Sequence, residues 1–319
     1  MPFLAESEAL LAESEALLAE SEGLLAESEG LLAESEGLLA ESEGLHARVR
    51  ALGRKGGPIA PGDFDGLALD IARFQLEHAP GFRRLVDAHG GSEKLVTAAD
   101  IPAVPVDAFR LTRVATYQED LDVARFETSG TTGAASGVHV MRTTDTYRLL
   151  SIAWGRRALI SAWSGPRVVV ALAPLPTGRA SAAPTSSLGF MMRAFMEEFD
   201  GRSLSAGEGR AAFDADARDR WLAGPSGIDV SGLRRAADLA RDRDEPLLVL
   251  ATGFSLVLLL EALAGSTIAA PARTVVMPTG GFKGRTRAAP PAELARDVAR
   301  AFGIPETQVI GEYGMTELS

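Results

Sequence analysis

A run of hydroxyl and glycine residues, Glu-Thr-Ser-Gly-Thr-Thr-Gly at 127–133, is the segment of this chain best suited to chemistry. No bulky side chain separates the hydroxyls from the glycines, so backbone N–H groups and short hydroxyls can close around phosphate oxygens. The nucleoside-triphosphatase loop needs Gly-x-x-x-x-Gly-Lys-Ser/Thr, and no lysine follows this run, which excludes that motif. Taken alone, the segment is equally typical of an ordinary turn.

A second segment of this kind is Gln308 to Ser319, which reads Gln-Val-Ile-Gly-Glu-Tyr-Gly-Met-Thr-Glu-Leu-Ser. A short apolar stretch breaks at a glycine, and an aromatic ring, a hydroxyl and a carboxylate follow it. An aromatic ring can stack on a nucleobase, a threonine can hydrogen-bond a phosphate oxygen, and a glutamate can hold Mg²⁺, which prefers oxygen ligands. Together the two segments favour a site for a magnesium-bound nucleotide.

Both segments resemble motifs of the adenylate-forming enzymes, the superfamily of acyl-CoA synthetases and related acyl-activating ligases. Further segments resemble the LuxE-type acyl-protein synthetases, in the same order, over residues 64–319. The matching segments are Phe64 to Leu69, Phe74-Gln75, Pro80 to Arg84, Ile101 to Phe109, Ser129 to Gly133, Ser136 to His139, Ser186 to Met191 and Gly280 to Lys283. The resemblance is specific, because ordered motifs coincide by chance far less often than one motif does.

The resemblance implies a ligase that uses ATP and Mg²⁺ to join a fatty acid to AMP and then passes the acyl group to a thiol. It implies that Glu317 binds the metal, that Thr316 contacts the α-phosphate and that Tyr313 packs on the adenine. The residues it assigns to the ATP phosphates are Thr128, Ser129, Gly130, Thr131, Thr132 and Gly133, and those along the adenine are Gly280 and Gly281. Such a half-reaction gains mainly from positioned donors and from a metal that spreads charge.

The chain departs from many relatives just after the glycine-rich run, where they carry a lysine. Here the sequence reads Ala-Ala-Ser-Gly-Val-His at 134–139. LuxE-type sequences also tend to show a histidine at this place, which makes His139 a candidate catalytic residue. The alternative interpretation is a partly buried, hydrogen-bonded histidine at the start of a strand.

The sequence stops at Ser319, whereas family members continue with a ribose-binding acidic residue, a hinge and a small C-terminal lid. The LuxE type has its acyl-accepting cysteine in that region, and these 319 residues contain no cysteine. We therefore expect a truncated chain, or a thiol acceptor on CoA, a carrier protein or another subunit such as a fatty-acid reductase. Two alternatives are an acyl-CoA or aryl-CoA ligase similar to phenylacetate-CoA ligase, and a non-catalytic remnant with a scaffold repeat.

Composition fits a cytoplasmic enzyme. The chain is 46% hydrophobic, enough to bury a substantial core. Its net charge of −11 comes from residues 1–45, which hold twelve glutamates and no lysine or arginine. The rest of the chain has 31 acidic and 32 basic residues and is therefore nearly neutral. This near-neutral balance predicts no nucleic-acid surface, which would need clustered basic residues. No apolar run is long enough to cross a bilayer, no secretory signal pattern is present, and the four histidines lack metal-ligand spacing.

The segment Leu4 to Leu45 consists of six consecutive copies of Leu-Ala-Glu-Ser-Glu-Ala/Gly-Leu. A seven-residue period is typical of a helix with a repeating face, but serine falls where a coiled coil needs an apolar residue. The four glycines of the repeat, Gly23, Gly30, Gly37 and Gly44, together lower helix stability by about 4 kcal/mol relative to alanine. We predict a low-complexity heptad repeat over 1–45 that is partly helical or disordered, with self-association and a dispensable solvated arm as open interpretations.

Strands and helices alternate beyond a flexible linker at 46–63. Apolar runs predict strands at 167–172, 247–251, 274–277 and 308–310, and helical periodicity predicts helices at 64–89, 187–199, 233–241, 255–264 and 291–302. The pattern predicts an α/β fold, and the resemblance implies the N-terminal domain of adenylate-forming enzymes over 64–319, with largely parallel sheets flanked by helices and without the lid. Ligands of such sheets bind beyond the carboxyl ends of strands, and both Gly280-Gly281 and Tyr313 to Glu317 follow strands.

The predicted helix at 187–199 puts Met191, Met192, Phe195 and Met196 on one apolar face. These side chains have the flexibility to line an acyl pocket, but at helical spacing they are more typical of core. We expect them in the core.

Overall fold

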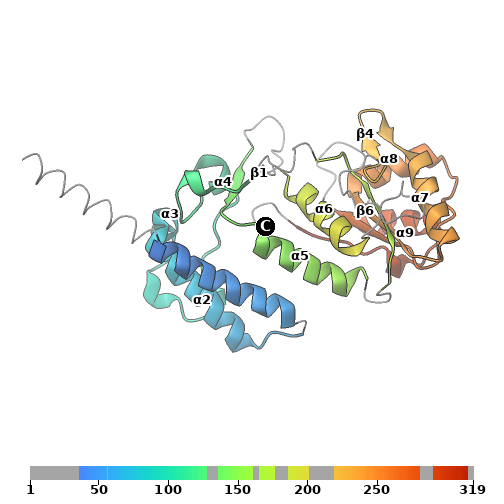
Figure 1. The fold of residues 1–319 in the computed structure, drawn as a ribbon. Helices are drawn as coiled ribbons and strands as arrows, with labels where there is room; N and C mark the ends of the chain where they lie inside the picture. The colour runs from blue at the N-terminus through green and yellow to red at the C-terminus, as the bar shows by residue number, and fades with distance from the viewer. Residues whose placement is uncertain are drawn as a thin grey trace, which may run out of the picture.

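The computed structural model describes residues 36–55, 57–127, 136–160, 165–176, 186–200, 219–280 and 290–314. These residues form an α/β structure in which a group of N-terminal helices lies beside a parallel sheet flanked by helices (Figure 1). The α/β class predicted from the sequence is confirmed.

The central sheet has three parallel strands, ordered β3 (Val168–Leu172), β6 (Leu247–Thr252) and β7 (Val275–Thr279). Every residue of β3 and all but the last of β6 are buried, as expected for parallel strands covered on both faces. Isolated parallel bridges extend the sheet at both edges. Ala171 bridges Trp221 beside β3, and Val276 and Thr279 bridge Val309 and Glu312 beside β7.

Alternate residues of β3 point to opposite faces of the sheet. Val168, Val170 and Leu172 share a core with α7 (Val230–Asp242), α8 (Gly253–Leu263) and α9 (Pro291–Phe302). Val169 and Ala171 share the other core with α6 (Ser187–Phe199). Helices therefore cover both faces of the sheet, as predicted.

The methionine-rich face of α6 is core. Met192, Phe195 and Met196 are fully buried and pack in the same cluster as Leu248 and Leu250 of β6. The prediction of a core role is confirmed, because this face of α6 is the one that contacts the sheet.

A helix that the sequence did not predict, α5 (Asp145–Ala158), covers α6. A Cβ at Gly155 would lie 3.0 Å from the rings of Phe195 and Phe199, so glycine allows the close approach of these two helices. Trp154 stacks on Phe195 with ring centroids 6.4 Å apart. Polar and β-branched residues within α5 weaken its helical pattern, and only packing on α6 reveals its partner.

The N-terminal helices are helical residues 36–55, α2 (Pro61–His78), α3 (Pro80–Ala88) and the short α4 (Ala108–Leu111). The single helix predicted over 64–89 is wrong, because Pro80 lacks an N–H and ends α2 before it. Residues 46–55, which the sequence assigned to the linker, continue a helix that lies along α2 (Figure 1). Its Arg48 forms a 2.8 Å ion pair with Asp70 of α2.

The remaining elements are short. They are the strands β1 (Ala124–Glu127), β2 (Val138–Met141), β4 (Ala223–Gly224) and β5 (Gly227–Ile228), and the 3-10 turns η1 (Ser92–Lys94), η2 (Ala98–Asp100), η3 (Glu119–Leu121) and η4 (Glu306–Gln308). A strand over 308–310 was predicted, but Gln308 ends η4, and the backbone bridges β7 only at Val309 and Glu312. No helix among the described ranges is both long enough and apolar enough to cross a membrane.

Candidate functional site

Two predicted site residues meet where β7 ends. Thr279, the last residue of β7, is bridged to Glu312, so Gly280 and Tyr313 each follow one member of a bridged pair. The Ile310 N–H donates to the Val276 carbonyl and the Glu312 N–H to the Pro278 carbonyl, each at 2.9 Å. These bonds fix the register and place Gly280 and Tyr313 side by side at the carboxyl end of the sheet.

Gly280 turns the chain away from the sheet. Its φ is +69°, a left-handed conformation that favours glycine, and no atom lies within 4 Å of the place where a Cβ would stand. The conformation, rather than crowding, therefore requires glycine. Gly281, predicted to act with it, lies outside the described residues.

Tyr313 presents its ring to solvent, with 83% of the residue exposed. Beside it, Gly280 is exposed, and no atom lies within 4 Å of the place where a Cβ of Gly280 would stand. An open ring next to open backbone fits a planar, partly apolar ligand such as a nucleobase. Thr316 and Glu317, the predicted α-phosphate and metal residues, lie outside the described residues.

Glu312 ties this segment to β7, and the sequence analysis missed it. The hydroxyl of buried Thr279 donates to the Glu312 carboxylate. A Cβ at Gly314 would lie only 2.7 Å from Oε1 of Glu312, so glycine there leaves room for this carboxylate. The available signal was the position of an acid directly before the Tyr-Gly pair, at the end of a strand-like stretch.

β6 ends at the same edge of the sheet and leads directly into α8. The Thr252 hydroxyl accepts from the Ser255 N–H at 3.0 Å, and the Ser255 hydroxyl accepts from the Thr252 N–H at 2.9 Å. This reciprocal cap satisfies two otherwise orphan donors and fixes the start of α8 beside the strand end.

The glycine-rich run connects the two strands of a β-hairpin. β1 and β2 pair antiparallel, from Ala124 with Met141 to Glu127 with Val138. The last pair holds the two ends of the connection about 5 Å apart, the spacing of neighbouring strands. The six predicted phosphate-binding residues lie outside the described residues. They are Thr128, Ser129, Gly130, Thr131, Thr132 and Gly133.

The hairpin is anchored on α5 and on the first turn of α6. Phe126 is fully buried and contacts the rings of Tyr147 and Phe190, each with centroids 5.9 Å away. The Tyr147 hydroxyl donates to the Ser187 carbonyl at 3.1 Å. Since α6 is the first helix after β3, these contacts place the hairpin near the start of a helix that follows a sheet strand.

His139 lies on β2 opposite Phe126, half-buried. Its ring makes an edge contact with Phe109 of α4, with centroids 5.3 Å apart. This agrees with the interpretation of a packed histidine at the start of a strand, and a contact to ATP stays a prediction.

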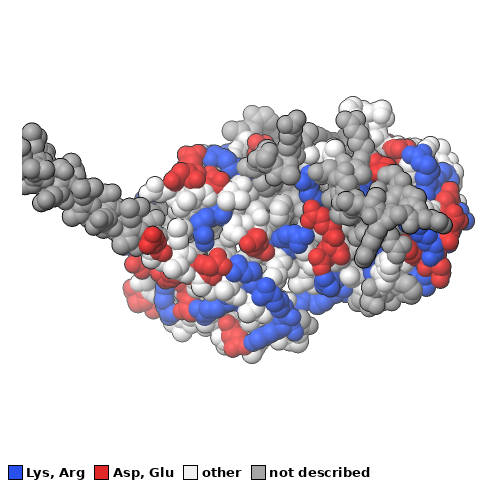
Figure 2. Space-filling view, in the orientation of Figure 1, with Lys and Arg blue, Asp and Glu red and all other residues white. Residues whose placement is uncertain are grey.

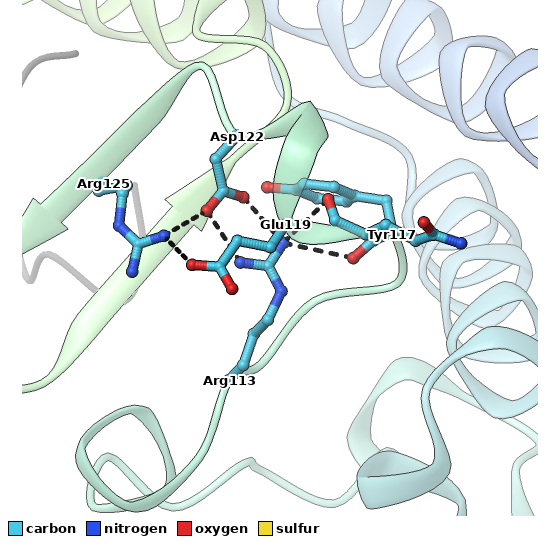
Figure 3. Close-up of polar contacts among 6 residues, drawn as sticks. Arg113, Tyr117, Glu119, Asp122 and Arg125 are labelled. Atoms are coloured by element: carbon cyan, nitrogen blue, oxygen red, sulfur yellow. Dashed lines mark hydrogen bonds and ion pairs between the residues drawn. The ribbon is translucent and has the colours of Figure 1, made fainter.

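A network of charges holds the segment that leads into β1 (Figure 3). Arg113 donates to both oxygens of Asp122, at 2.9 and 2.8 Å, and Arg125 of β1 donates to Asp122 at 2.8 Å and to Glu119 at 2.7 Å. The Arg113 guanidinium also lies over the ring of Tyr117, 5.1 Å from its centroid.

The same network shifts two pKa values. Hydrogen bonding to Asp122 raises the pKa of Arg113, and burial, followed by the charge of Asp122, raises the pKa of Tyr117. Both shifts favour the protonated forms, which these groups already hold at neutral pH. The network links residues 113–122 to β1 and so orients the strand that carries the glycine-rich run.

Comparison with known proteins finds similarity over the segment that contains this hairpin. Residues 64–183 match the family described as "Acyl-protein synthetase, LuxE". A "Long-chain-fatty-acid--luciferin-component ligase" of Photorhabdus luminescens is 33% identical over 72 residues, which is 23% of this chain and 62% of that protein's length. No solved structure matches. The matched residues include β1, β2 and the glycine-rich run and end before Gly280 and Tyr313. They make up less than half of the chain, so the similarity to this family is a similarity of residues 64–183.

Proposed function

We propose that this chain activates a fatty acid with ATP, as an acyl-adenylate, for transfer to a thiol acceptor. The observation that carries the proposal is the pairing of Thr279 with Glu312, which brings Gly280 and Tyr313 to one edge of the sheet. The glycine-rich hairpin that would hold the phosphates lies within the LuxE-type segment. A fatty acid is proposed as the substrate because the similar Photorhabdus luminescens protein is named as a long-chain-fatty-acid ligase.

In the proposed first step, a carboxylate oxygen of the fatty acid bonds to the α-phosphorus of ATP. The bond from that phosphorus to the pyrophosphate oxygen breaks, and pyrophosphate leaves. In the second step a thiolate attacks the acyl carbon, the bond to the phosphate oxygen breaks, and AMP leaves. The carboxylate and the thiol bring their own nucleophiles, so the protein mainly positions groups and neutralises charge.

Each predicted residue has a place in this scheme. Tyr313 lies against the adenine and the Gly280-Gly281 backbone runs along it, while residues 128–133 donate to the phosphates. Thr316 contacts the α-phosphate, and His139, on strand β2 of the hairpin, is a contact to the nucleotide. Mg²⁺, bound by Glu317, would spread the negative charge of the phosphates.

The acceptor lies outside the 319 residues, since they contain no cysteine. We propose CoA, a carrier protein or a fatty-acid reductase as the source of the thiol, in the cytoplasm where ATP is available. Self-association through residues 1–45 stays an open hypothesis, which sedimentation of the chain with and without the repeat would decide.

The test is carboxylate-dependent exchange of labelled pyrophosphate into ATP. The assay uses the longest reading frame that contains this sequence, with Mg²⁺ and either tetradecanoate or acetate. We expect exchange with tetradecanoate to exceed exchange with acetate by at least about tenfold, because each buried methylene of the substrate adds binding energy. Absence of exchange with every carboxylate would reject the proposal.

Substitution of the proposed metal carboxylate sharpens the test. Glu317→Gln keeps the size of the side chain and removes its charge, so exchange should fall by about 100-fold, equivalent to about 2.7 kcal/mol of transition-state stabilisation. Glu306→Gln, at an exposed glutamate of η4, is the matched control and should leave exchange unchanged. Near-normal exchange in Glu317→Gln would remove this residue from the metal site.

A further inference from the structure

An apolar pocket of about 800 Å³ lies between helical residues 36–55, α2 and α5. One stripe of α2 forms its longest wall, with Phe64, Leu67, Ala68, Ile71, Ala72 and Gln75 at helical spacing. Its volume falls within the roughly 300–1,000 Å³ that is usual for small-molecule sites. Three elements separated in the sequence therefore combine to build one concave surface.

The walls leave large apolar side chains open to water. Phe64 is 53% exposed and Ile59 is 42% exposed, and both line the pocket. The helix of residues 36–55 approaches α5 closely at Gly53. A Cβ there would lie only 2.4 Å from Cδ2 of Leu150, so a larger residue would require this side chain to shift. Apolar surface that is exposed and hollowed in this way is typical of a binding site.

Arg157 is the one charged residue among those that line this pocket. It is exposed, and it makes no ion pair with any other residue in the described parts of the chain. By contrast, two other arginines of α5 are paired with glutamates of α6. Arg156 pairs with Glu198, and Arg148 pairs with Glu197 at 2.9 Å. The pocket thus combines long apolar walls with a single uncompensated positive charge.

α5 and α6 separate the pocket from the sheet. Trp154 and Gly155 of α5 pack on Phe195 of α6, while Leu150 and Arg157, two turns apart on α5, face the pocket. A ligand with its charged group at Arg157 would therefore lie behind two helices, away from the sheet edge that carries Gly280 and Tyr313.

We propose that this pocket is an accessory site for a long-chain fatty acid, with the alkyl chain along α2 and the carboxylate at Arg157. A single aliphatic chain with one anionic group matches both features of the pocket, because the walls exclude further charges and the guanidinium binds carboxylate oxygens well. The site holds the acid without ATP, so its test does not depend on the proposed ligase activity.

The experiment is calorimetric titration of the full chain with saturated fatty acids of 8, 10, 12 and 14 carbons, below their micellar concentrations and without ATP or Mg²⁺. Burial of each further methylene should lower the Kd about 3- to 4-fold until the pocket is filled. Arg157→Gln should raise the Kd for dodecanoate about tenfold or more and leave the Kd for dodecanol unchanged. Arg156→Gln, next to it and outside the pocket, should have no effect.

A second pair of variants tests the walls without risk to the core. Phe64→Ser should raise the Kd at least about fivefold, whereas Val96→Ser, at an exposed apolar residue outside the pocket, should not change it. Equal affinities for the Arg157 and Arg156 variants, or for the Phe64 and Val96 variants, would overturn the proposal. So would sedimentation showing that the chain dimerises and that Phe64→Ser abolishes the dimer, because a second copy would then be the occupant. Pyrophosphate exchange in Arg157→Gln reports separately on the ligase.

Discussion

Tyr313 and Gly280, which lie far apart in the sequence, are brought to one edge of the sheet as a candidate site. Tyr313 is exposed and Gly280 carries no side chain, so neither contributes to the core. Their positions depend on Thr279 and Glu312, whose hydroxyl–carboxylate hydrogen bond joins β7 to the segment beside it. At this scale, the residues that position the site and the residues that would bind a ligand are different ones.

Replacement of the exposed ring should weaken nucleotide binding without affecting the fold. Stacking of a base on an aromatic side chain contributes about 1–3 kcal/mol by alanine substitution, so Tyr313→Ala should raise the Kd for ATP about 5- to 100-fold. Tyr313→Phe keeps the ring and should bind ATP as the wild type does. Calorimetric titration measures both, and inorganic triphosphate, which has no base, should bind all three proteins equally. Equal ATP affinity in Tyr313→Ala would remove this ring from the site.

Charged side chains help to hold the described elements in place, and two groups of them are the most informative. Arg113, Asp122 and Arg125 fix the entry to β1, and a second, fully buried pair joins the end of α6 to the sheet. In that pair the Asp200 carboxylate accepts from Arg220 and from the Val169 N–H of β3, at 3.1 Å for the latter. The first network orients the candidate site, and the second is part of the core.

The network before β1 should matter for the glycine-rich run that β1 carries. Asp122→Asn removes the charge that two arginines share, so the free energy of unfolding should fall by about 1–3 kcal/mol and ATP binding should weaken. Asp120→Asn, at an exposed position of the same turn, is the matched control. Chemical denaturation and ATP titration give the two readings. A variant as stable as the control would show that the network is only a surface feature.

The buried pair should be costly to break from one side. Arg220→Met leaves the Asp200 charge buried, which should lower the free energy of unfolding by about 3–5 kcal/mol. The double variant Asp200→Leu with Arg220→Met removes both charges and should recover part of that loss. Urea denaturation of the single and double variants checks this, and equal stability of both would contradict it.

Across the whole molecule, the helical residues 36–55 join the N-terminal layer to α5. His46 Nδ1 lies 3.0 Å from the Thr146 hydroxyl of α5, and Arg50 donates to the same hydroxyl at 3.0 Å. The visible face carries acidic and basic residues interspersed, without a single-sign stripe, in line with the near-neutral charge beyond the repeat (Figure 2). Packing and a few polar contacts, rather than a strong field, hold the layers together.

This contact predicts a loss of stability in acid. Burial, with the nearby charges of Arg142 and Arg50, lowers the pKa of His46 below 6.5, although Glu43 acts in the opposite direction. Below pH 6.5 the unfolded chain binds a proton that the folded chain excludes, so stability is full above that pH and falls as pH drops through it. Melting temperatures between pH 5 and 8 should show this fall, and His46→Gln should reduce it. An identical pH profile in the variant would contradict the assignment.

Buried elements could be predicted from the sequence, and their connections could not. The apolar run at 247–251 was predicted as a strand and is β6, because a strand buried on both faces is apolar throughout. The helical pattern at 291–302 was predicted as a helix and is α9, because one face of that helix is buried and leaves apolar residues at helical spacing. A strand near His139 was anticipated only as one interpretation, and β1 and α5 were not predicted, because short strands and polar helices depend on distant partners such as Phe190 and Phe195. Glu312 escaped for the same reason, since its role depends on Thr279.

The sequence by itself determined the chemistry that is available: a hydroxyl- and glycine-rich run, a Tyr-Gly-x-Thr-Glu segment, no thiol, and apolar patterns that require an α/β core. These follow from residue types and short spacings, which the sequence contains completely. Only the tertiary structure decided that β7 and residues 309–312 are neighbours, which brings Gly280 and Tyr313 to one edge of the sheet. It also decided that three helices line one apolar pocket together with Arg157. Such contacts join residues far apart in the chain, and the packing that selects them is not encoded in any local pattern.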